Sequence, residues 1–330
     1  MIYLNIPVTK ILLNMTLQQI QQLAIQLGIK NDLRGEAKVH KNLARVKEKY
    51  TSLSKEAKEE FDLVKLTNPY SDSRILVDTG RKTIKKVLAG IDMGGAELLL
   101  AKQLGDIDLV IAHHPEGRAL SDLHDVMSLQ AEVLSQYGVP INVAESVIKP
   151  RISEVSRGVA PINHNRNVDM ARVLGIDYMC CHTIQDNMAA MFMVKFLEKN
   201  KKNIERVGDI LKLLKTIPEY KEASKNGMAP RLFVGHEEAS AGKVVVTEFT
   251  GGTNGAKEIY EKMSQAGIGT IIGMHMSEEP RKEAEKHHIS VVIAGHMSSD
   301  SLGMNLFLDQ LEIKGIKVVP ISGLIRVKRK

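Results

Sequence analysis

Short apolar runs alternate with longer segments of helical periodicity from Arg74 onward, and this alternation restricts the fold more than any other feature. It is typical of α/β sheets whose strands are joined by crossover helices. The chain is therefore predicted to be an α/β protein with two α/β halves joined by helices. Strands are expected at 85–92, 107–113, 140–146, 178–182, 243–249, 270–274, 289–296 and 316–322, with helices between them.

The first part of the chain has a different character, because its apolar residues recur only at helical spacing. Thr16 and Ser54 stand directly before such segments, where their side chains can cap a helix start. A polar turn cluster at 67–73 then marks a predicted boundary. We expect a helical extension over 1–70 and a core over 71–330, with its two halves at roughly 71–200 and 230–330.

Composition excludes several classes of protein. The 330 residues are 43% apolar, and no apolar run approaches the roughly 20 residues that span a bilayer. The start lacks the pattern of a secretory signal, so a cytoplasmic location is expected. Cys180 and Cys181 are adjacent and form neither a disulfide framework nor a Cys-x-x-Cys metal site. A net charge of +6 favours anionic partners, but without Trp and with 4% aromatics a base-stacking surface is not expected.

Metal-type ligands recur where predicted strands end. In an open α/β sheet the carboxyl ends of parallel strands share one edge, where ligands collect. Imidazoles and carboxylates gathered there suit a borderline divalent metal ion. Taken singly, the aspartates could be helix caps and the histidines ordinary loop residues. The residues in question are His113, His114, His182, Asp186, His275, His296 and Asp300.

Several nearby residues are candidates for other roles. His182, His275 and Glu116 could transfer a proton or orient a ligand. The loop TGGTNG, with Gly251 and Gly252, is either an anion cradle at a helix start or a plain tight turn. Arg118 could bind a phosphorylated substrate or be a surface charge. The catalytic residues themselves stay unassigned.

Four segments together resemble the NIF-three-like family, whose members are often described as GTP cyclohydrolase I type 2. They are AGIDMGGAELLLAKQLGDIDLVIAHHPEG, NRNVDMARVLGID, CCHTIQD and AGHMSSDSLGMNLFLDQL. The resemblance implies two α/β lobes with a metal cleft between them, and homo-oligomers that include hexameric toroids. It also implies two divalent ions, with Zn, Fe, Mn, Co and Ni not distinguished. By matching motifs, the implied ligands are His113, His114, Asp186, His296 and Asp300.

One position departs from the family pattern, which has Glu where this chain has Asp300. Since aspartate is one methylene shorter, we expect Asp300 to bind a single ion and Asp186 to bridge the two. Two functional hypotheses follow. The first is a metal-dependent hydrolase acting on a nucleotide or a related phosphorylated or heterocyclic small molecule. The second is a non-catalytic metal-binding or regulatory scaffold, with nucleic acid as one partner of its basic helical start.

Overall fold

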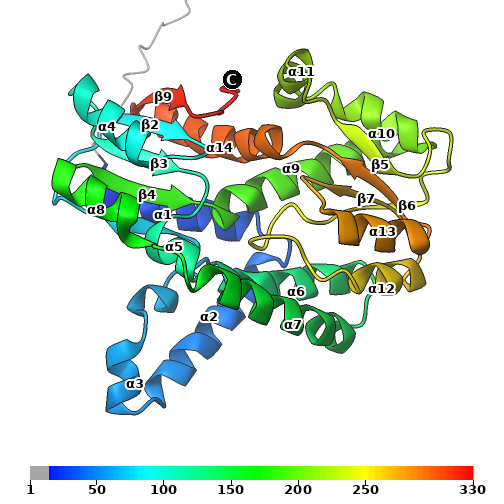
Figure 1. Ribbon diagram of the computed structural model, residues 1–330, viewed down its shortest axis with the longest axis horizontal. Helices are drawn as coiled ribbons and strands as arrows, with labels where there is room; N and C mark the ends of the chain where they lie inside the picture. The colour runs from blue at the N-terminus through cyan, green and yellow to red at the C-terminus, as the bar shows by residue number, and fades with distance from the viewer. Residues whose placement is uncertain (1–14, 330) are drawn as a thin grey trace, which may run out of the picture.

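The computed structural model describes residues 15–329, which form two parallel-rich sheets with helices around them (Figure 1). The first sheet has the strand order β1-β4-β3-β2-β9, and the second has the order β5-β8-β7-β6. In each sheet the edge strand β1 or β5 is antiparallel to its neighbour, and the other strands are parallel. The strands are β1 (Ser73–Val77), β2 (Lys86–Gly90), β3 (Leu109–Ala112), β4 (Asp177–Cys181), β5 (Arg231–Val234), β6 (Lys243–Val246), β7 (Ile268–Gly273), β8 (Ser290–Ile293) and β9 (Lys317–Ile321).

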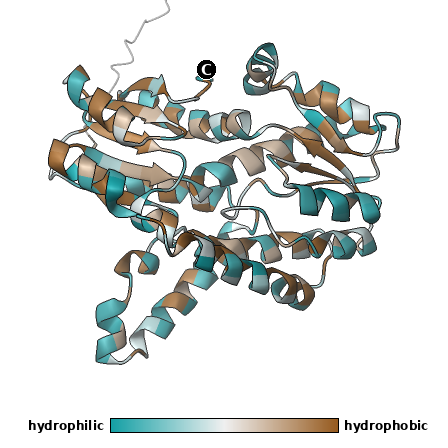
Figure 2. Ribbon diagram, in the orientation of Figure 1, coloured by the Kyte–Doolittle hydropathy of each residue, from teal (hydrophilic) through white to brown (hydrophobic). Residues whose placement is uncertain are grey.

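Helices cover the sheets and connect them, and the α/β class expected from the sequence is confirmed. Figure 2 shows hydrophobic residues concentrated along the strands and mixed colouring on the helices, as expected for helices that bury one face. Within the described residues, no helix has both the length and the apolar character to cross a membrane. The helices are α1 (Leu17–Lys30), α2 (Glu36–Thr51), α3 (Lys55–Glu60), α4 (Gly95–Leu104), α5 (Gly117–Ser121), α6 (Ser128–Gln136), α7 (Ile141–Val159), α8 (Asn165–Leu174), α9 (Thr183–Asn200), α10 (Val207–Leu214), α11 (Pro218–Lys225), α12 (Ile259–Gln265), α13 (Glu278–Lys286) and α14 (His296–Ile313).

The beginning of the described chain is helical, as expected. Thr16 caps α1 in a capping box with Gln19, and the Ser54 hydroxyl accepts a hydrogen bond from the backbone of Ala57 at the start of α3. Helix α1 buries Leu17 and Ile20 in a core cluster that also contains residues of the first sheet, α9 and α14. By contrast, α2 and α3 project away from the body (Figure 1). The segment at 67–73, predicted as a polar turn, is largely buried.

The strand expected at 140–146 was predicted wrongly, because this segment opens α7. Its alternating apolar residues resembled a strand, but the side chains that are buried are Ala144 and Ile148, which are spaced by four as on a helix. The edge strands β1 and β5 were not predicted. Strand β1 begins inside the segment predicted as a polar turn, and β5 is only four residues long with Arg231 and Phe233 exposed.

Helices α9 and α14 run across the middle of the molecule between the two sheets (Figure 1). Helix α9 follows β4 of the first sheet, and α14 follows β8 of the second and leads back to β9. The two helices pack tightly at Gly303, where a Cβ atom would lie 2.3 Å from the backbone oxygen of Gln185. Glycine at this position therefore lets the second turn of α14 lie close against the first turn of α9.

Candidate metal centre

Three histidines and two aspartates from both sheets meet at one point. His113 and His114 follow β3, Asp186 lies in the first turn of α9, and His296 and Asp300 lie one turn apart at the start of α14. Because β3 and β4 are parallel neighbours, as are β7 and β8, their carboxyl ends bring these side chains to shared edges. The clustering that the sequence predicted is present.

Asp300 is the residue that joins the cluster into one unit. Its Oδ1 lies 3.5 Å from His113 Nε2, which is also 3.4 Å from Asp186 Oδ1. Its Oδ2 lies 3.5 Å from Nε2 of both His114 and His296. Two groups that could hold a metal ion share this carboxylate, namely His113, Asp186 and Asp300 in one and His114, His296 and Asp300 in the other.

This arrangement differs from the expectation that Asp186 would span both groups. Asp186 belongs to only one of the two Asp300-containing groups, and its Oδ2 lies 3.6 Å from His182 Nε2. The close approach of α14 to α9 at Gly303 supplies a physical reason, since it brings Asp300 near enough for the shorter side chain to reach both groups.

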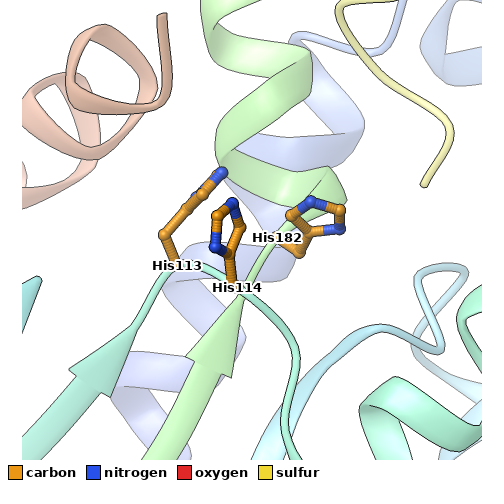
Figure 3. A group of neighbouring side chains, drawn as sticks. All are labelled: His113, His114 and His182. Carbon is orange, nitrogen blue, oxygen red and sulfur yellow. The ribbon is translucent and has the colours of Figure 1, made fainter. Parts of the chain in front are cut away.

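His182 stands beside the cluster and joins a third group with His113 and His114. Figure 3 shows the three rings near one another, two of them after β3 and one at the end of β4. The ring centroids of His113 and His182 are 5.1 Å apart. His275, which follows β7, packs against His296 with centroids 4.6 Å apart.

The cluster contains buried polar atoms that have no hydrogen-bond partner. They include His113 Nε2, Asp186 Oδ1 and both carboxylate oxygens of Asp300. Leaving such atoms unpaired in the interior costs on the order of 1–3 kcal/mol each. Because they converge on one another, a bound cation would satisfy them together, and the chemistry of the donors fits a divalent metal ion.

Each of the three histidines beside β3 and β4 has a partner on its other ring nitrogen. His113 Nδ1 lies 2.8 Å from Gln185 Oε1, His114 Nδ1 lies 2.6 Å from Asp92 Oδ1, and His182 Nδ1 lies 2.8 Å from Asp72 Oδ2. An acceptor at Nδ1 favours the tautomer with its proton there, which leaves Nε2 free to bind a metal. The ring orientations are therefore fixed for ligation.

The charges of the clustered histidines and aspartates also shift one another's pKa values. Burial alone would lower the pKa of His113, but Asp300 and Asp186 outweigh it and raise that pKa well above its ordinary value. Burial alone would raise the pKa of Asp300, but the neighbouring histidines lower it below its ordinary range. His275 behaves differently, since burial and the adjacent His296 lower its pKa to about 4.

A cavity of about 400 Å³ opens in front of the cluster. Six residues of the cluster and its surroundings line this cavity: His114, His182, Asp186, His275, His296 and Asp300. Glu248 and Gly252 also border it. The remaining wall is mainly apolar or hydroxyl-bearing and includes Leu120, Leu123, Phe249, Thr250, Thr253 and Met274.

The loop at 249–255, which borders this cavity, is tied down by several side chains. Gln130 donates to the carbonyl oxygens of Gly251 and Thr253, at 2.8 and 2.6 Å. The Thr250 hydroxyl donates to Asn187 Oδ1 at 2.6 Å. Asn187 in turn donates to Asp32, which lies beyond α1, at 3.2 Å.

The remaining sequence candidates fall in three places. Glu116 stands at the N-cap position of α5 without a capping side-chain hydrogen bond; its carboxylate accepts from Asn167, and it does not line the cavity. Arg118 is exposed and lies near Asp62 and Asp122, at 3.6 and 3.5 Å. Gly252 lines the cavity, whereas Gly251 packs on Gln130; both adopt positive φ, as a tight turn requires.

Sequence reasoning missed the partners that orient the rings. Asp72 lies just before the unpredicted β1, and Asp92 follows β2 at the same edge as the histidine pair. A signal for Asp92 was present, because it is the last residue of a predicted strand. Asp72 gave no such signal, since only the antiparallel pairing of β1 with β4 brings it to His182.

The fold and the cluster define an α/β protein with a candidate metal centre. The residues of this centre follow strands of both sheets. No family model matches the chain, and no curated protein does. Among solved structures, a NIF3 superfamily protein from Sphaerobacter thermophilus is 31% identical, with a TM-score of 0.71 over 77% of this chain and 92% of that one. The chain belongs to the NIF3 superfamily, which confirms the resemblance found in the sequence.

A second solved structure shows the same fold at lower similarity. Reduced HcgD from Methanocaldococcus jannaschii is 14% identical, with a TM-score of 0.51 over 80% of this chain and 94% of that one.

Proposed function

We propose that this protein is a metal-dependent hydrolase with a dinuclear centre, acting on a nucleotide or a related phosphorylated or heterocyclic small molecule. The observation that carries the proposal is Asp300, whose two oxygens each face a different His/Asp group. In the proposal His113, Asp186 and Asp300 hold one ion, and His114, His296 and Asp300 hold the other. Carboxylates that bridge two cations are the usual way to keep such ions close.

Two divalent ions held in this way would lower the pKa of a water molecule and polarise a carbonyl or phosphoryl oxygen of the substrate. The chain's own residues set the geometry. Asp72, Asp92 and Gln185 hold three imidazole rings in place, so that little rearrangement is needed on binding. His182 and His275 line the cavity and are the candidates for moving a proton to or from the substrate. Imidazole and carboxylate donors suit Zn, Fe, Mn, Co and Ni alike.

The test is metal content per subunit, measured by elemental analysis of protein loaded with each metal and desalted. Asp300→Asn should lose both ions, because the shared carboxylate is removed while the shape is kept. Asp186→Asn should retain the ion held by His114 and His296. If Asp300→Asn keeps two ions while Asp186→Asn loses both, the bridging residue has been assigned wrongly.

Turnover separates the enzyme from the alternative. Metal-loaded protein should hydrolyse members of a panel of nucleotides, nucleosides and heterocycles, and Asp300→Asn should abolish that turnover. Stoichiometric metal binding without turnover of any panel member would favour a metal-binding or regulatory scaffold. We further propose that the protein forms a homo-oligomer, for which a hexameric toroid is one arrangement. Sedimentation analysis of the purified full chain tests this proposal.

A further inference from the structure

The wall of the cavity opposite the metal cluster has no positive charge. Among residues 15–329, no lysine or arginine lines this cavity. Arg118, the cation that the sequence suggested for a phosphate, is exposed and already lies beside Asp62 and Asp122. The phosphate of a phosphorylated substrate would therefore meet no lysine or arginine side chain in this cavity, and only the metal ions could neutralise its charge.

Part of the glycine loop is already bound to acceptors of the protein itself. The backbone N–H of Gly255 points at the Glu248 carboxylate, with its nitrogen 3.3 and 3.2 Å from the two oxygens. The N–H of Thr253 donates to Gly251 O at 3.2 Å. Two of the loop's N–H groups thus already have acceptors within the protein, and an anion beside the ionised form of Glu248 would meet repulsion.

The same wall suits an uncharged ring. Leu123, Phe249 and Met274 offer apolar surface, and a cavity of about 400 Å³ has room for a small ligand of one or two rings. Because the Thr250 hydroxyl donates its proton to Asn187, its oxygen is presented as an acceptor. An N–H group on the ring would match that acceptor.

We propose that, of the substrates compatible with the proposed hydrolase, this cavity takes an uncharged heterocycle that carries a cyclic amide, and not its phosphorylated counterpart. The reaction opens the ring: the oxygen of water bonds to the carbonyl carbon, the C–N bond breaks, and the nitrogen receives a proton. The products are a carboxylic acid and an amine or amide nitrogen, so no oxidant or further reactant is needed. The ring-opening chemistry of this inference rests on the proposed function. The choice of an uncharged ligand rests on the residues of the cavity wall.

Calorimetry on the metal-loaded full chain tests the ligand class. The compounds are uridine, its phosphorylated counterpart uridine monophosphate, and dihydrouracil as a small uncharged cyclic amide. The neutral compounds should bind at least about ten-fold more tightly than the phosphate, because a phosphate dianion would lose hydration without gaining a cation on the wall. Tighter binding of the monophosphate would overturn the inference. So would a lack of binding by both neutral compounds at millimolar concentration.

A matched pair of loop variants sharpens the result. Thr253→Lys should raise the affinity for uridine monophosphate at least about ten-fold by placing a cation on the wall, while Thr253→Val should not. Ring opening of dihydrouracil, detected by mass spectrometry, then distinguishes the proposed hydrolase activity from the proposed ligand class. If the neutral compounds bind but the ring is not opened in a metal-dependent reaction, the proposed hydrolase activity is refuted and the proposed ligand class is retained. Hydrolysis of phosphorylated compounds alone would do the reverse.

Discussion

At the scale of single residues, the two aspartates that orient histidine rings differ in burial, and this difference predicts different effects on metal binding. Asp72 is fully buried and accepts from both His182 and the Thr183 hydroxyl, whereas the Asp92 side chain is 70% exposed. His182 forms a third possible metal-binding group with His113 and His114, so Asp72→Asn should weaken metal affinity roughly 10- to 100-fold, as expected when the buried partner of a ligand is lost. Asp92→Asn is the matched control and should have a smaller effect. Competition with a chromogenic chelator measures both, and an equal effect would contradict the importance of burial.

Glu248 predicts a pH dependence of stability that is independent of the cluster. Burial raises the pKa of Glu248 to about 7, only partly offset by the Gly255 N–H and the charge of Arg151 on α7; Tyr260 on α12 also faces it. Since the folded pKa lies above the unfolded one, the folded state holds this proton more tightly. The stabilisation is complete below about pH 4.5 and is lost as the pH rises to about 7.

Glu248→Gln removes that titration. The variant should therefore gain roughly 1–3 kcal/mol over the parent between pH 5 and 8, because the parent must bury a charge that the amide lacks. Urea unfolding of metal-free protein at several pH values measures this difference. A difference that stays constant with pH would show that Glu248 does not titrate in this range.

The sequence predicted the ligand-type residues because a strand end is a local feature. His113, His182 and Asp186 each follow an apolar run closely. Which carboxylate joins the two groups could not be predicted, since it depends on how closely two distant helices pack. The shorter side chain of Asp300, a departure from the family pattern, favoured Asp186, whereas the contacts of both Asp300 oxygens favour Asp300.

At the scale of elements, the contact between α9 and α14 should control the cluster. Gly303→Ala would place a methyl group 2.3 Å from Gln185 O, so the helices must separate. Such overpacking costs about 1–3 kcal/mol, and metal affinity should fall as Asp300 moves away. Gly158→Ala in α7 is the control, because nothing lies within 4 Å of its added Cβ. This control should be neutral or stabilising by up to about 1 kcal/mol in thermal unfolding, with unchanged metal content.

Elements with strong periodicity were predicted well, and ambiguous ones were not. The central strands β2, β3, β7 and β8 have largely buried side chains and appear in the sequence as apolar runs. The segment at 140–146 is too short to distinguish alternation from helical spacing, and only its packing decides. Helix α14 begins at His296, earlier than its apolar stripe suggested, because its first turn is polar and faces the cluster.

At the scale of the whole molecule, the segment at 326–329 links distant parts through buried ion pairs. Arg329 pairs with Glu219 of α11 at 2.6 Å, and the Glu219 side chain is fully buried. Arg329→Met should destabilise the protein by about 3 kcal/mol, because it leaves a buried carboxylate without its cation. Lys328→Met is the control, since Lys328 is 67% exposed and should contribute little. Equal unfolding midpoints in urea for the two variants would refute the prediction.

The sequence predicted two α/β halves but not how the chain passes between the two sheets. Strand β9, near the end of the described chain, pairs with β2 in the first sheet, so the second sheet lies in the sequence between β4 and β9. Such long-range pairing has no local signature. The contact from Asp32 through Asn187 to Thr250 is equally non-local, and it connects the helical extension to the cavity loop.

The return of the chain to the first sheet sets an order for synthesis. On the ribosome, β1 to β4 emerge early, together with His113, His114 and His182, but β2 keeps an open edge until β9 has been made. His296 and Asp300 emerge only shortly before that strand. A nascent chain that stops before α14 thus exposes both an unpaired strand edge and an incomplete ligand set, so closure of the first sheet and completion of the centre become a single late event.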